Sequence, residues 1–162
     1  MPVLRFDDYK NHQELLEKIR YINKAYYVPV AKNIVYLQGR SGEVSLIYAV
    51  ALRDAHSHLA KIFEYEDILA TENKIRIVRQ LERYMGHLEE LLYDTYVKVI
   101  HKKSENLFSQ LSEGERPRIK KQLAEKIQNV RTVNDQITIE QKIENFVKIS
   151  DFIEEVFNKH HS

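Results

Sequence analysis

Imidazole, carboxylate and guanidinium groups gather in two segments of this chain, one around His58 and one around His87. Asp54 and His58 are spaced i, i+4, so a helix would place them on one face, and His87 and Asp94, seven apart, would also share a face. Such groups can transfer protons, bind a metal ion or form hydrogen bonds between helices. Which of these they do depends on the elements that position them.

Those elements are predicted to be helices, because apolar residues recur with a helical period over nearly the whole chain. We expect a kink or break at Pro29, a loop at 38–42, a turn at 112–117 and a further kink or loop near 132–135. Connections this short favour antiparallel neighbours. The sequence therefore predicts an all-α, up-and-down bundle of four or five long antiparallel helices in a single domain, 1–162. The predicted helices span about 8–37, 43–66, 73–111 and 119–157.

Folding the second and third of these helices against each other, about residues 70–71, places Asp54 opposite His87 and His58 opposite Arg83. Polar groups beside an apolar stripe commonly pair through hydrogen bonds and so set the register of two helices. We interpret these residues as a structural polar layer. Its members are Asp54, His58, Arg83, His87 and Asp94.

A metal site built from the same residues is an alternative, since His58, His87, Asp54 and Asp94 are common ligand types. The paired Glu-x-x-His pattern of di-iron bundles is absent, however, and the chain has no Cys. We therefore expect neither a metal nor a cofactor.

The segment Arg53-Asp54-Ala55-His56-Ser57-His58 resembles the signature of the HEPN superfamily, compact all-α proteins that include many ribonucleases. The resemblance covers these six residues and the helical architecture. It implies that Arg53 stabilises charge on the scissile phosphate, that His58 acts as general acid or base, and that Asp54 fills the polar position after the Arg. It also implies a homodimer with a composite, metal-independent active site.

Basic residues concentrate where the third predicted helix ends and the fourth begins. If the turn at Gly114 is tight, they share one end of the bundle and could bind RNA or an acidic protein; the alternative is a solvated basic surface, partly neutralised by nearby Glu residues. Cations in the first turns of a helix oppose its dipole, so they do not serve helix stability. The residues are Lys98, Lys102, Lys103, Arg116, Arg118, Lys120 and Lys121.

Composition excludes several classes of protein. The 25 basic and 24 acidic residues nearly cancel, and the chain contains no Cys, no long apolar run and no phosphate-binding glycine loop. We expect a cytoplasmic protein without membrane association. The favoured function is a non-catalytic helical protein that self-associates, with a dimer favoured, and binds a protein or nucleic-acid partner. A HEPN-like endoribonuclease is the alternative.

Overall fold

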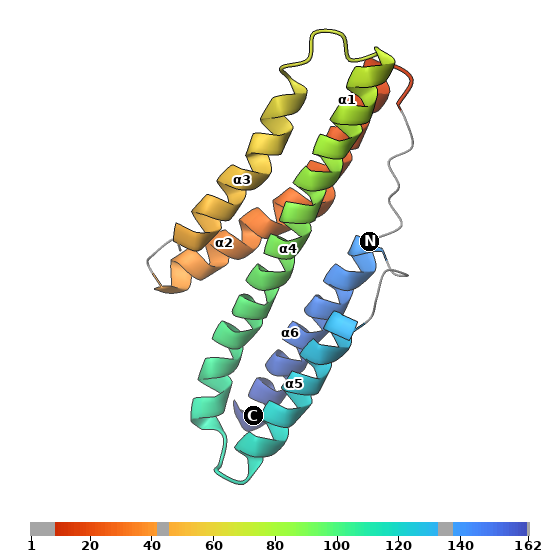
Figure 1. Cartoon of the computed structure of the whole chain (residues 1–162). Coiled ribbons are helices and arrows are strands. Elements are labelled where there is room, and N and C mark those ends of the chain that lie inside the picture. Colours follow the sequence, from red (N-terminus) through yellow and green to blue (C-terminus); the bar gives the residue numbers. More distant parts are fainter. Residues whose placement is uncertain (1–8, 42–45, 133–137, 162) are drawn as a thin grey trace. The chain divides into compact units, whose positions relative to one another are not determined.

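The computed structural model describes residues 9–41, 46–132 and 138–161, and the regular structure within these ranges is entirely helical. Because α1, η1 (a π-helical turn) and α2 follow one another without a break, the described residues form five helical stretches. This confirms the predicted all-α class (Figure 1). The bounds are α1 His12–Ile22, η1 Asn23–Tyr27, α2 Val28–Ser41, α3 Leu46–Ile62, α4 Thr71–Gln110, α5 Glu115–Thr132 and α6 Ile139–His161.

The described residues group into two compact units, those up to Thr95 (the N-terminal unit) and those from Tyr96 onward (the C-terminal unit). The first contains α1, η1, α2, α3 and the first part of α4, and the second contains the rest of α4 with α5 and α6. The single-domain assignment stays a prediction. Among the described residues, no helix combines the length and apolar character that crossing a membrane requires.

In the N-terminal unit, α3 runs antiparallel to α4, because Tyr84 lies against His56 and His87 lies against His58. The stretch from α1 to α2 runs parallel to α4. Near the middle of this stretch, Asn23 accepts a hydrogen bond from Tyr84. Farther along, Asn33 donates a buried hydrogen bond of 3.1 Å to Thr95. This is the up-and-down order that short connections predict. The core between these helices includes Ile22, Tyr26, Val30, Ala55, Ile62, Ile77, Leu81 and Leu88.

Pro29 was expected to kink or break the first stretch. The stretch does not break there but changes direction between α1 and α2 (Figure 1), with η1 directly before the proline, closed by a hydrogen bond from the Val28 amide to the Asn23 carbonyl. Proline has no amide hydrogen and crowds the carbonyl one turn earlier, and a π-helical turn shifts the hydrogen-bond ladder at that point. The helix continues as α2 through Gln38–Ser41, so the loop predicted there is wrong for these four residues; Gly42 lies outside the described residues. One glycine costs a helix only about 1 kcal/mol, too little to end it at Gly39.

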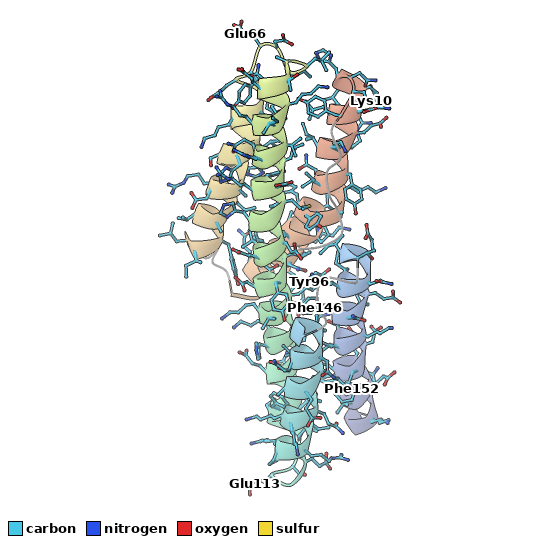
Figure 2. The ribbon with its side chains drawn as sticks, turned by 45° about the vertical axis from the view of Figure 1, so that its right-hand side comes forward. Lys10, Glu66, Tyr96, Glu113, Phe146 and Phe152 are labelled. Carbon is cyan, nitrogen blue, oxygen red and sulfur yellow. The ribbon has the colours of Figure 1, made fainter. Side chains whose placement is uncertain are left out.

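In the C-terminal unit, α5 runs antiparallel to α4 and α6. Tyr96 on α4 stacks on Phe146 of α6 with ring centroids 4.9 Å apart (Figure 2). The turn before α5 is closed by Ser112, whose hydroxyl accepts from the Glu115 amide. Thr138 and Gln141 form a reciprocal capping box at the start of α6, so local side chains satisfy the exposed amides there.

Candidate functional site

The imidazoles of His58 and His87 stack across the seam between α3 and α4, with ring centroids 5.0 Å apart and planes 13° from parallel. The Nδ1 atom of His58 lies 2.8 Å from Oε1 of Gln80. An amide oxygen only accepts hydrogen bonds, so Nδ1 of His58 carries the proton and donates it. His58 is half-buried and His87 exposed. The structure therefore brings together two residues of the predicted polar layer and adds Gln80, which sequence reasoning missed.

The other members of the predicted polar layer lie elsewhere. Asp54 lies 3.4 Å from the guanidinium of its neighbour Arg53, with both side chains mostly exposed, so its structural partner is Arg53 and not His87. Arg83 is exposed, and His58 bonds Gln80 in place of it. Asp94 lies near Tyr48, where burial and then the Asp94 carboxylate raise the pKa of that phenol.

A second polar cluster lies on another side of α3, and the sequence analysis did not identify it. His56 contacts Tyr27 edge-on, with centroids 5.3 Å apart, and Tyr84 at 5.8 Å. The buried Tyr84 hydroxyl donates a 2.6 Å hydrogen bond to Asn23 Oδ1, within the π-helical turn. Burial, followed by the nearby Tyr27 hydroxyl, raises the pKa of Tyr84 to about 12. This phenol therefore stays protonated and serves as a hydrogen-bond donor between helices.

The HEPN-like signature is not assembled within one chain. Arg53 and His58 are five residues apart on one helix, a rotation of about 140°, so they project from different faces. Arg53 is 75% exposed and His58 faces α4. Any shared chemistry would need a second copy of the chain. Among the described residues, no group of three or more His, Asp or Glu side chains is arranged to hold a metal ion.

The predicted basic residues surround the α4–α5 turn, but several of them have intramolecular partners. Lys102 lies 3.7 Å from Glu105, and Lys103 lies 3.9 Å from Glu154. Arg116 donates from Nε to the Leu111 carbonyl at 3.1 Å, and the Lys120 ammonium lies 5.4 Å from the Phe108 ring centre. Lys98, Arg118 and Lys121 are exposed. The end of the unit is thus basic, yet much of its charge already serves the fold.

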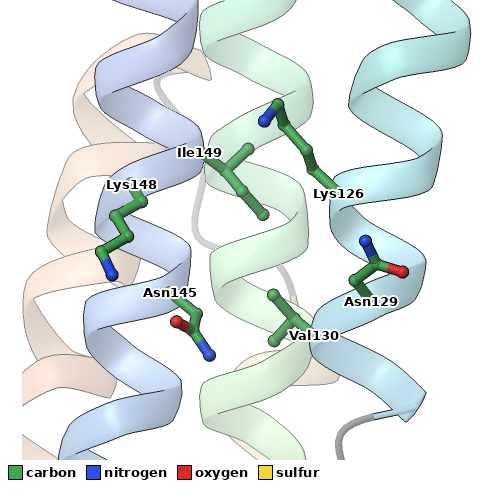
Figure 3. Close-up of a pocket in the computed structure, with 6 residues that line it drawn as sticks. All are labelled: Lys126, Asn129, Val130, Asn145, Lys148 and Ile149. Carbon is green, nitrogen blue, oxygen red and sulfur yellow. The ribbon is translucent and has the colours of Figure 1, made fainter.

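A shallow groove of about 230 Å³ lies between α5 and α6 (Figure 3). Its floor is apolar, with Val130 and Ile149, and its rim carries two Asn and two Lys. The ammonium of Lys126 lies 4.8 Å from the Phe152 ring centre, and that of Lys148 lies 3.9 Å from Glu144. Both cations therefore already interact within the chain, and the groove is not a ready anion site.

The most unusual surface of the N-terminal unit belongs to α3. Only Ala55 and Ile62 of its 17 residues are buried. Leu46 and Ile47 are 76% and 75% exposed, and Val50 is 38% exposed. Exposed aliphatic residues that follow one another on a helix commonly mark an interaction surface. The signal was present in the sequence, because the first half of this helix is apolar on all sides, which an amphipathic surface helix is not.

Comparison of the chain with protein-family models, with curated proteins and with solved structures gave no match. The likeness to HEPN proteins therefore rests on its six residues and the helical architecture.

Proposed function

We propose that this chain is a non-catalytic helical protein that acts through self-association, with the outward face of α3 as the contact surface. The exposed Leu46, Ile47 and Val50 carry this proposal. Two side chains that could act as an acid or base are engaged in the fold, since His58 bonds Gln80 and Tyr84 bonds Asn23. The exposed aliphatic groups on the surface of α3 are suited to contact with another protein surface.

The strength of the contact follows from its size. Full burial of a Leu, Ile or Val side chain contributes about 1.5–3 kcal/mol. Three such side chains from each of two copies contribute on the order of 10 kcal/mol, which lies within the estimated cost of association, about 4–15 kcal/mol. We therefore expect a weak dimer whose population depends on protein concentration.

Sedimentation velocity between about 5 and about 500 µM tests this expectation, a range that brackets a weak dissociation constant. The wild type should shift from monomer to dimer as concentration rises. Leu46→Gln combined with Ile47→Gln should remain monomeric with an unchanged circular dichroism spectrum. Leu16→Gln is the matched control, because Leu16 is 49% exposed on α1, and it should dimerise like the wild type. A wild type that stays monomeric throughout, or a double variant that still dimerises, would refute the proposal.

The alternative function is a HEPN-like endoribonuclease, and one observation favours it. Arg53 and Asp54 project from the same face of α3 as the exposed aliphatic residues, so self-association there would bring the two signatures toward one interface. In this case Arg53→Ala and His58→Ala should each abolish RNA cleavage in EDTA. Arg53→Ala should also leave the melting temperature unchanged, because the side chain is exposed. Absence of cleavage by the wild-type dimer would eliminate this alternative.

A further inference from the structure

No further inference is drawn: the strongest candidate, the outward face of α3 with its exposed Leu46, Ile47 and Val50, belongs to the contact surface already described, and nothing in the part of the chain that the structure describes shows what covers it.

Discussion

At the scale of single residues, His58 shows how a polar side chain can hold two helices together. Its proton is directed to Gln80 and its ring lies against His87. A half-buried donor that loses its acceptor costs about 1–3 kcal/mol, more than an exposed polar contact contributes. The residue is accordingly expected to matter for stability.

A double-mutant cycle tests this assignment. Gln80→Ala and His58→Ala should each lower the free energy of unfolding by about 1 kcal/mol, and together by less than the sum, with a coupling of at least about 0.5 kcal/mol. Asp54→Ala and His87→Ala should add within about 0.5 kcal/mol, because the structure pairs Asp54 with Arg53. Urea denaturation measures all four. Coupling between Asp54 and His87 would contradict this expectation and support the pair predicted from the sequence.

Tyr84 makes a prediction about alkaline pH. Its folded pKa of about 12 lies above the ordinary tyrosine value of 10.0. Below pH 10 both the folded and unfolded states keep the proton, and the stabilisation is complete. As pH rises from about 10 to about 12, the unfolded state ionises first, so the free energy of unfolding should fall by on the order of 1–3 kcal/mol.

Tyr84→Phe serves as the comparison. It should be less stable than the wild type at neutral pH, because Asn23 loses its donor, and its stability should decline less steeply above pH 10. Absorbance near the phenolate band, together with denaturation at each pH, measures both effects. A Tyr84 that ionises with the exposed tyrosines would contradict the assignment.

At the scale of elements, α4 shows that a long helix can include a glycine, which is a poor helix former, without breaking. Gly86 lies in its interior, and nothing lies within 4 Å of the position that a Cβ would occupy. Gly86→Ala should therefore raise the free energy of unfolding by about 0.5–1 kcal/mol, since alanine loses less backbone entropy on folding. Thermal denaturation should show a higher melting temperature. A lower one would mean that another chain approaches α4 closely at this glycine.

The π-helical turn is the other element with a local cause. It lies directly before Pro29 and supplies Asn23, the acceptor for Tyr84. The hydrogen-bond ladder therefore shifts next to the proline, where η1 and α4 are bonded to each other. The sequence marked the position through Pro29 and indicated a kink or a break, and the chain forms a continuous helix with a π-helical turn there.

At the scale of the whole molecule, a further question is whether the chain binds nucleic acid through the basic residues around the α4–α5 turn. If it does, Lys120→Glu with Lys121→Glu should weaken the affinity for RNA and reduce the slope of log affinity against log salt, because fewer counterions are released. Lys24→Glu with Lys32→Glu changes the net charge equally on exposed sites of the N-terminal unit and should have little effect. Fluorescence anisotropy over a salt series measures both. Equal effects of the two pairs would show that binding follows net charge alone, and absence of binding by the wild type at low salt would remove RNA as a partner.

The helical class and most helix positions could be predicted from the sequence, because apolar spacing and turn residues act over a few neighbours along the chain. The antiparallel course of α3 and α4 also followed, since their connection is short. The sequence located His58 and His87 near each other for the same reason. It placed Arg83 rather than Gln80 opposite His58, because the rotation of each helix about its axis depends on how its side chains pack.

Helical spacing along α3, with Tyr48, Leu52, Ala55, Leu59 and Ile62 on one stripe, indicated which side faces the rest of the unit, but the tertiary structure alone decided how much of the helix is covered. Hydrophobicity by itself would bury Leu46 and Ile47 before Ala55, yet Ala55 is fully buried and the two larger residues face outward. A helix that packs on only one side buries only the stripe of residues that faces its neighbours, even when the residues on its other side are more hydrophobic. That geometry depends on contacts between residues far apart in sequence, and it leaves on the surface the aliphatic residues from which the interface was inferred.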